Sequence, residues 1–426
     1  MGEVTSSRIS GSSSRHDAAA AVFPEERMAH RMRQLGTETA FAVSAEAAAH
    51  AAAGHDVFPF HIGDLNLPTP VNILEATFRA ARDGHTGYCP PMGIPELRDA
   101  LAEDISTSHG VSYTRDNVAV QPGGKPVIGK FLLATMNPGD EVLYPNPGYP
   151  IYESQIEFHG GVAVPYGYVE DPQGFRIDLD LLESLITEKT RLLILNDLQN
   201  PLGAECTTEE FQRLAEIVER HDLLVLCDEA YFDIRYEGHS TSFVSVNNMV
   251  ERCVILYTFS KKFAMTGWRL GAAVGPRSLI AAIGALNVND ESCTNHFVQV
   301  GAIEGLRGDP SGPREIIDTL RHRRDTAVRL LGEIPGVHCA SPRATFYLFP
   351  NVTGAMGQLG MTDVEVFRRH LLEETGVSVC SRVHFGRPRG NESQFYLRLA
   401  YSGIDASLIE EGLTRMRDYL GEVSRG

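Results

Sequence analysis

Short apolar runs alternate with longer amphipathic stretches in the middle of the chain. The runs cover residues 117–120, 141–144, 161–166, 191–195, 222–227, 253–257 and 271–275. Because they are short, continuous and rich in leucine and β-branched residues, they are typical of strands that are covered on both faces of a sheet. The alternation of such strands with helices predicts an α/β fold with a doubly wound, mostly parallel sheet.

The segment that follows Cys206 gives the clearest helix signal. Thr207 and Glu210 have the spacing of a capping box, in which each side chain accepts a hydrogen bond from the other's backbone N–H. Phe211, Leu214 and Val218 then recur at helical spacing. We therefore expect an amphipathic helix that packs one face on the sheet.

The pattern changes after about residue 310. A long helical segment leads to strands within 344–352, 377–385 and 393–402, with helices near 363–375 and from Asp405 onward. This is the pattern of a smaller α+β unit. The predicted division is a tail at 1–22, a segment at 23–68 that joins the small domain, a large domain at 69–315 and a small domain at 316–426.

Composition excludes several classes of function. The chain has 426 residues and a formal net charge of -17, which disfavours binding to nucleic acid or to an anionic membrane. No apolar run approaches the roughly 20 residues of a membrane span. The seven cysteines are scattered without a CxxC pair, which indicates reduced thiols in a cytoplasmic protein and no metal site.

Two adjacent lysines, Lys261 and Lys262, follow the apolar run at 253–257. A lysine amine becomes a nucleophile when burial or nearby positive charge lowers its pKa. Lys261 is expected at the carboxyl end of a strand, where open α/β sheets bind ligands. Lys262 is expected to point the other way.

The stretch TFSKKFAMTGWRLG, residues 258–271, resembles the signature of the class I/II pyridoxal-phosphate-dependent aminotransferases, the aspartate aminotransferase superfamily. The resemblance implies fold type I, in which a large domain has a mostly parallel seven-stranded sheet between helices and a smaller domain is α+β. It implies that Lys261 binds pyridoxal 5'-phosphate (PLP) as a Schiff base, the internal aldimine. It also implies that Arg269 and Ser260 contact the cofactor phosphate. Thr258 replaces the family's usual Ser or Gly.

Two further motifs resemble the family's contacts to the pyridine ring. LLVLCDEAYFD supplies Asp228 for the ring nitrogen and Tyr231 for the ring 3'-oxygen, and LNDLQNPLG supplies Asn200 as the other partner of that oxygen. The family usually has NNPTG where this chain has QNPLG. We expect Gln199 and Leu202 to alter the shape of the pocket.

The phosphate cradle and the stacking ring are also assigned by resemblance. AVQPGGKPVIGKF places Gly123, Gly124 and Lys125 between a strand and a helix, where free backbone N–H groups bind phosphate. PNPGYPIY places Tyr149 where the family stacks an aromatic ring on the cofactor.

The same resemblance assigns the substrate contacts. Arg398 is expected to pair with the α-carboxylate of an amino acid through two parallel hydrogen bonds, with Gly63 and Asn200 beside it. Tyr88 is expected to reach the phosphate of the neighbouring subunit, which implies a homodimer with shared active sites.

The resemblance implies an aminotransferase that moves the amino group of an L-amino acid to a 2-oxo acid, most often 2-oxoglutarate in this family. The alternative is a PLP enzyme of the same fold that catalyses β/γ-elimination, replacement, cyclisation or carbon–carbon bond formation in specialised metabolism. A PLP-sensing regulator is disfavoured, because the first 60 residues are too short and too weakly basic for a DNA-binding domain.

Two departures from the family pattern bear on the substrate. Ala344 stands where the family commonly has glycine. Asp290 and Glu291 precede a segment that the family keeps neutral. They either form a solvated helix turn, the interpretation that we favour, or meet a cationic group of the substrate.

Overall fold

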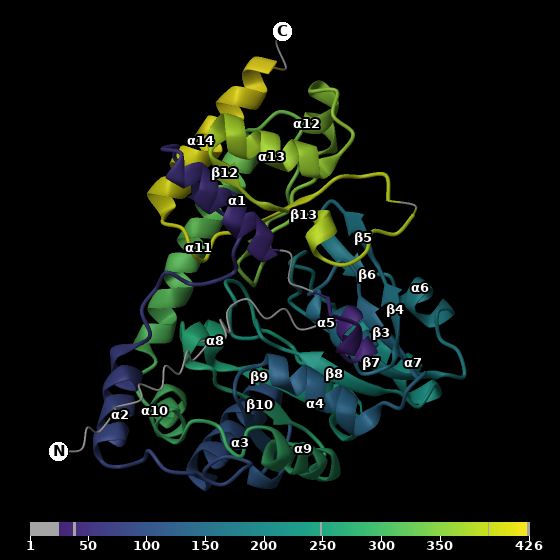
Figure 1. Cartoon of the computed structure of the whole chain (residues 1–426), viewed down its shortest axis with the longest axis vertical. Coiled ribbons are helices and arrows are strands. Elements are labelled where there is room, and N and C mark those ends of the chain that lie inside the picture. Colours follow the sequence, from purple (N-terminus) through teal and green to yellow (C-terminus); the bar gives the residue numbers. More distant parts are fainter. Residues whose placement is uncertain (1–24, 37–39, 248, 391, 424–426) are drawn as a thin grey trace, which may run out of the picture.

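The computed structural model describes residues 25–36, 40–247, 249–390 and 392–423. The tail predicted at 1–22 lies outside these residues. Figure 1 shows a broad α/β unit from which the long helix α11 leads up to a smaller unit that carries the C-terminal helix.

The large unit is built on a seven-stranded sheet that contains all seven apolar runs. In spatial order its strands are β2 (Val118–Gln121), β10 (Gly271–Val274), β9 (Cys253–Thr258), β8 (Leu224–Asp228), β7 (Thr190–Leu195), β3 (Glu141–Pro145) and β4 (Val162–Tyr166). β10 runs antiparallel to both of its neighbours, and the other pairs are parallel. The predicted α/β class with a mostly parallel seven-stranded sheet is therefore confirmed.

Helices cover both faces of this sheet, which explains why its strands are largely apolar on both sides. Along β3, Val142 and Tyr144 pack on one face and Leu143 on the other, as the two-residue period of a strand requires. The first face is covered by α4 (Lys125–Thr135), α5 (Ile151–Phe158) and α9 (Arg277–Asp290). The second is covered by α3 (Pro95–His109), α7 (Thr208–Arg220) and α10 (His296–Arg307), with α2 (Val71–Arg82) packed on α10.

The predicted capping box is present at the start of α7. The Thr207 side chain accepts a hydrogen bond from the N–H of Glu210, and the Glu210 carboxylate accepts one from the N–H of Thr207. Phe211, Leu214 and Val218 are buried against the sheet. A hairpin that the sequence analysis did not predict, β5 (Tyr168–Asp171) with β6 (Gly174–Ile177), leads to the short helix α6 (Leu179–Ser184).

The smaller unit has its own core and short strands. A three-stranded sheet has the order β11 (Tyr347–Leu348), β14 (Leu397–Ala400) and β13 (Cys380–Ser381), and β1 (Phe58–Pro59) pairs in parallel with β12 (Val377–Ser378). Its helices are α1 (Ala40–Ala52), α11 (Ser311–Leu331), α12 (Thr353–Gln358), α13 (Val364–Thr375) and α14 (Ala406–Val423). α1 lies beside α13 although the two are far apart in sequence, and Glu46 of α1 pairs with Arg368 of α13 at 2.6 Å (Figure 1). The exact domain boundaries stay a prediction.

Two of the strands predicted in this unit are much shorter than expected. At 344–352 the strand is limited to β11, because Thr345 has a positive φ of 65° and turns the chain. At 377–385 the strands end at Ser381, where a second capping box between Ser381 and His384 starts a 3-10 turn, η8 (Arg382–His384). No helix of the described residues is long and apolar enough to cross a membrane.

Candidate active site

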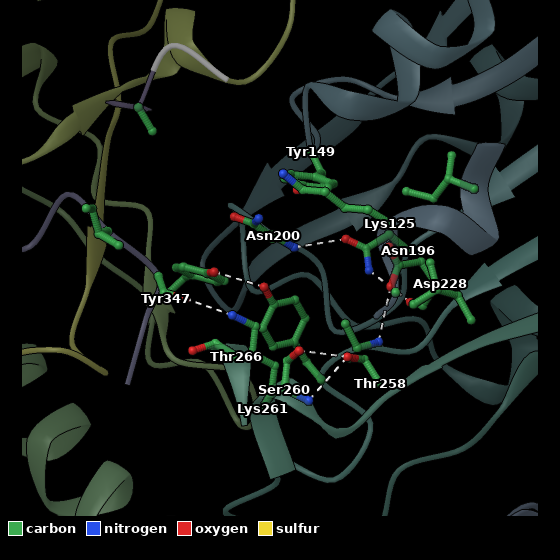
Figure 2. A pocket seen from close by; sticks show the side chains of 18 of the residues that line it. Lys125, Tyr149, Asn196, Asn200, Asp228, Thr258, Ser260, Lys261, Thr266 and Tyr347 are labelled. Carbon is green, nitrogen blue, oxygen red and sulfur yellow. Dashed lines mark hydrogen bonds between the residues drawn. The ribbon is translucent and has the colours of Figure 1, made fainter. Parts of the chain in front are cut away.

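A cavity of about 240 Å³ lies where the large and small units meet. Its lining includes the predicted site residues Gly63, Gly124, Lys125, Tyr149, Asn200, Asp228, Tyr231, Ser260, Lys261, Arg269 and Arg398. Figure 2 shows the labelled side chains approaching one another from facing walls. Residues from 63 to 398 are therefore brought together in one place.

The strand ends of the large sheet position the central residues of this cavity. Asp228 is the last residue of β8, and the next strand in the sheet, β9, ends at Thr258 just before Lys261. Because neighbouring parallel strands end at the same edge, the two side chains reach one cavity. Lys261 itself lies on a four-residue helix, α8 (Phe259–Lys262), whose first turn is capped by the Thr258 hydroxyl.

The two adjacent lysines point in different directions, as predicted. The Lys261 ammonium donates a hydrogen bond to the carbonyl of Gly63 at 2.8 Å. Lys262 lies outside the cavity lining and pairs with Asp233 at 3.1 Å and with Asp104 at 3.5 Å. Lys261 therefore faces the cavity, and Lys262 is held by two carboxylates elsewhere.

Asp228 is held at the cavity wall by hydrogen bonds to both carboxylate oxygens. The Tyr152 hydroxyl donates to Oδ2 at 2.6 Å, and the backbone N–H of Ala230 donates to Oδ1 at 3.1 Å. Burial raises the pKa of Asp228 to about 6, although both hydrogen bonds act to lower it. Such a carboxylate is poised to pair with a cation in the cavity, because pairing would offset its desolvation.

Asn200 and Tyr231 flank Asp228. Asn196 ties Asn200 to the strand end, since its Oδ1 accepts the N–H of Asn200 at 3.1 Å and its Nδ2 donates to the carbonyl of Asp228 at 2.9 Å. The Tyr231 and Tyr347 hydroxyls lie 2.9 Å apart and share a hydrogen bond. The pKa of Tyr231 is raised well above its usual value, chiefly by burial.

Gly123 and Arg269 form a narrow corner at the start of α4. Gly123 has a φ of 102°, and a Cβ atom at this position would lie 2.2 Å from Nη2 of Arg269. Glycine is required there because other residues rarely adopt this positive φ and because a Cβ atom would collide with the guanidinium. Arg269 also has a positive φ, 56°, and its Nη1 donates to the carbonyl of Thr266 at 2.6 Å. A guanidinium therefore lies beside the start of a helix, an arrangement that binds phosphate.

Arg398 is buried on β14 between two aromatic rings. Its guanidinium carbon lies 4.7 Å from the ring centre of Tyr347 and 4.8 Å from that of Phe385. It donates to the carbonyl of His61 and approaches Oδ1 of Asn200 at 3.4 Å, while its Nε has no hydrogen-bond partner within the described structure. A buried guanidinium with an unused donor is suited to a carboxylate.

The family model for aminotransferase class I and II matches residues 55–416. The aspartate aminotransferase of Bacillus subtilis is 33% identical over 398 residues, which cover 92% of this chain and 99% of that protein. The probable aspartate/prephenate aminotransferase of Aquifex aeolicus is 34% identical over 400 residues, covering 93% and 99%. The chain belongs to the class I and II aminotransferases.

The fold comparison agrees with this assignment. The structure of an aspartate aminotransferase from Rhizobium meliloti superimposes with a TM-score of 0.86 at 28% identity, covering 93% of this chain and 99% of that one. The predicted family, fold type I, PLP as cofactor and aminotransferase activity are therefore confirmed.

The cavity of this aminotransferase fits PLP by the chemistry of its donors. The Gly123 corner has no room for a Cβ and offers backbone N–H groups and a guanidinium to a phosphate. Asp228 offers a buried carboxylate to a protonated ring nitrogen, and Lys261 offers an amine to the aldehyde. The roles of the individual residues stay predictions.

Two predicted site residues are absent from the cavity lining: Gly123, which abuts Arg269, and Tyr88, which lies apart from the cavity. Tyr88 is 89% exposed and borders a separate surface hollow with Cys293 and His296. Tyr149 lines the cavity, with the Lys125 ammonium 5.6 Å from its ring centre.

The acidic pair singled out in the sequence lies outside the cavity lining. Glu291 is not solvated as expected, because both of its oxygens lie 2.5 Å from the ammonium of Lys130, which is buried. The Asp290 side chain is exposed and 3.9 Å from the same ammonium. Glu291 therefore compensates a buried lysine of its own chain.

Sequence reasoning did not identify several residues that line the cavity, among them Asn196, Phe41, His61, Tyr152 and Tyr347. Tyr152 lies in the first turn of α5, three residues after Tyr149, and their ring centres are 5.7 Å apart, so the short spacing is a signal that could have placed Tyr152 near Tyr149. His61 and Tyr347 are brought in by the small unit, so their positions depend on tertiary structure.

Proposed function

We propose that this aminotransferase takes the amino group of an acidic L-amino acid of the aspartate type and transfers it to a 2-oxo acid, with 2-oxoglutarate as the acceptor. The carrying observation is that Lys261 and Asp228 line one cavity together with Arg398. The acidic donor is supported by the names of the relatives.

In this proposal Lys261 binds PLP covalently, and Arg269, Ser260, Gly123 and Gly124 hold its phosphate. Asp228 holds the ring nitrogen in its protonated form, and Tyr231 and Asn200 donate to the ring 3'-oxygen. Tyr149 stacks on the ring. When bound, PLP supplies an electron sink for the electron pair left on the substrate Cα.

The chain's own residues then orient the substrate and move its proton. Arg398 binds the α-carboxylate through two parallel hydrogen bonds, with Gly63 and Asn200 beside it. Lys261 would act as the general base that takes the proton from the substrate Cα and returns it during the conversion. Addition of water would release the 2-oxo acid and leave the amino group at the site, and the acceptor would take up that amino group by the reverse sequence.

The two adjacent lysines give a matched test of the covalent role. The holoenzymes of wild type, Lys261→Ala and Lys262→Ala are reduced with borohydride, and cofactor that remains attached after denaturation is measured by mass spectrometry. We expect attachment in wild type and Lys262→Ala and none in Lys261→Ala. Attachment in Lys261→Ala would contradict the assignment.

A half-reaction titration tests the transamination and the donor. Aspartate should bleach the visible absorbance of the bound cofactor, and 2-oxoglutarate should restore it. Consumption of substrate without this reversible bleaching would instead support elimination or replacement chemistry. If apolar amino acids bleach the absorbance and aspartate does not, the acidic donor is wrong.

We further propose a cytoplasmic homodimer in which Tyr88 completes the partner's site. Its support is the 89% exposure of Tyr88, which lies away from its own cavity. Lys261→Ala and Tyr88→Ala subunits, each weakly active, are mixed and allowed to exchange. With shared sites a hybrid dimer has one intact site, so the mixture should regain about a quarter of wild-type activity. No regain in a mixture that contains hybrids would exclude sharing.

A further inference from the structure

A second cavity, larger than the active site, lies on the other side of the loop that carries Asn200. Its volume is about 600 Å³, within the range of small-molecule sites. Its lining comes from the β5–β6 hairpin, the 202–209 segment, the loop at 235–241, and 339–343 of the small unit. It therefore lies between parts of the chain that also position the cofactor site.

Three apolar side chains line part of this cavity, and one of them is a departure from the family motif. Leu202 stands where the family usually has threonine in the QNPLG segment. It is 7% exposed, lines this second cavity and packs in one cluster with Phe349 and Phe175. The two phenylalanine rings meet edge to face with their centres 5.8 Å apart. The leucine therefore shapes the second cavity, not the active site.

One wall of the cavity concentrates positive charge. Arg235 pairs with Glu205 at 2.5 Å, whereas Arg343 is exposed and has no ion pair in the part of the chain described. Both guanidinium groups lie beside Gly238, within 3.2 Å and 3.7 Å of the position that its Cβ would take. Two adjacent guanidinium groups, of which one is paired with a carboxylate, attract a further anion.

An uncompensated negative charge lines the cavity at the start of α7. Glu209 lies in the first turn of that helix, is exposed and makes no ion pair within the described residues. The remaining charged pair of the lining, Arg176 with Asp171, is joined at 3.0 Å. Among the described residues of this lining, one cation and one carboxylate thus remain without an ion pair, together with the apolar side chains of Leu202, Phe175 and Phe349.

We propose that this cavity binds a free α-amino acid with an aromatic side chain. Its carboxylate pairs with Arg343, its ammonium group pairs with Glu209, and its ring packs on Leu202, Phe175 and Phe349. Because Leu202 follows Asn200 by two residues, the bound amino acid contacts the loop that carries Asn200.

The test measures binding with the active site blocked. Borohydride-reduced holoenzyme, in which the lysine amine and the cofactor aldehyde are permanently joined, is titrated with L-phenylalanine by calorimetry. We expect one saturable site per chain. The Arg343→Gln variant should bind at least about tenfold more weakly, since a hydrogen-bonded charge pair is lost. The Leu202→Thr variant, which restores the family residue, should also bind more weakly.

Two controls make the result decisive. Arg79→Gln removes an exposed arginine of α2 that does not line the cavity, and should bind as wild type. Arg343→Gln should retain the transamination rate of wild type, which shows that it is folded. Binding does not require turnover, so its failure is distinct from failure of the proposed donor.

Three outcomes would overturn the proposal. The first is no saturable binding to the reduced wild-type holoenzyme. The second is binding that Arg343→Gln leaves unchanged. The third is equal affinity for phenylpyruvate, which lacks the ammonium group that Glu209 is proposed to bind.

Discussion

Removal of the Tyr152 hydroxyl should move the pH dependence of cofactor binding. This hydroxyl is fully buried and donates to Asp228 at 2.6 Å, where it opposes the effect of burial that raises the pKa of Asp228 to about 6. In Tyr152→Phe the ring remains and the hydrogen bond to the carboxylate is lost. The pKa of Asp228 in the apoenzyme should therefore rise further.

The size of the shift follows from the strength of the lost bond. A hydrogen bond to a charged group contributes about 1.5–3 kcal/mol, and one pKa unit corresponds to about 1.4 kcal/mol. The pKa of Asp228 in the variant should then be about 7–8. At pH 7 the ionised fraction falls from about nine-tenths to between about a half and a tenth, and PLP affinity falls with it because the ring nitrogen loses its anionic partner.

The single tryptophan provides the assay. Trp268 precedes Arg269 in the predicted phosphate site, so quenching of its fluorescence reports titration of the apoenzyme with PLP. We expect the acid limb of the affinity profile to move up by about one to two pH units in Tyr152→Phe. Tyr166→Phe, which removes a buried hydroxyl bonded to a backbone carbonyl at 3.0 Å, should not move it. An unmoved limb in Tyr152→Phe would refute the reasoning.

Three further changes test other parts of the molecule. Burial raises the pKa of Asp197 to about 7, so the stability that its neutral form contributes is present at pH 4 and is lost as pH rises through 7. Asp197→Asn should therefore increase the free energy of unfolding by up to about 4 kcal/mol at pH 8, and much less at pH 4. The measured Tm should rise at pH 8 accordingly. An equal increase in the free energy of unfolding at pH 4 and pH 8 would show that ionisation of Asp197 is not the cause. Gly123→Ala should weaken PLP binding at least about tenfold by displacing the Arg269 guanidinium, and wild-type affinity in a titration would exclude the close approach. Glu291→Gln should destabilise the protein by about 3–5 kcal/mol in denaturant unfolding, because Lys130 stays buried without its carboxylate, and should leave the relative rates on cationic and neutral amino acids unchanged. Altered relative rates would instead restore a substrate role for this acid.

The large sheet could be predicted because its signal is local. Each of its strands is a largely apolar run, since helices cover both faces of the sheet. The residues that follow a run therefore lie at the end of a strand, and their position can be predicted from the sequence. The site residues Lys261 and Asp228 each follow or end such a run, so their meeting at one edge followed from topology. The family motifs then supplied the chemistry.

The small unit was harder to predict because tertiary contacts end its strands. After Ser381 the pattern still alternates, yet the Arg382 guanidinium is buried and donates to Asn146 and Glu392 at 2.6 Å each. These partners make a turn more favourable than a strand. Likewise, the sequence analysis favoured a solvated Glu291, because its partner Lys130 is 161 residues away in the sequence and gives no local signal.

The geometry around Arg398 bears on why the site should require an α-carboxylate. Its buried Nε has no partner among the described residues, and a buried donor without a hydrogen bond costs about 1–3 kcal/mol. Its Nη2 is bonded to the carbonyl of His61, and the Tyr347 ring covers its face. A carboxylate that binds here satisfies the unused donor, whereas an amine without a carboxylate leaves it unsatisfied. We infer that the small unit discriminates on the carboxylate, while Lys261 on the large unit moves the proton and Asp228 holds the ring nitrogen, so that reaction requires both units to hold one substrate.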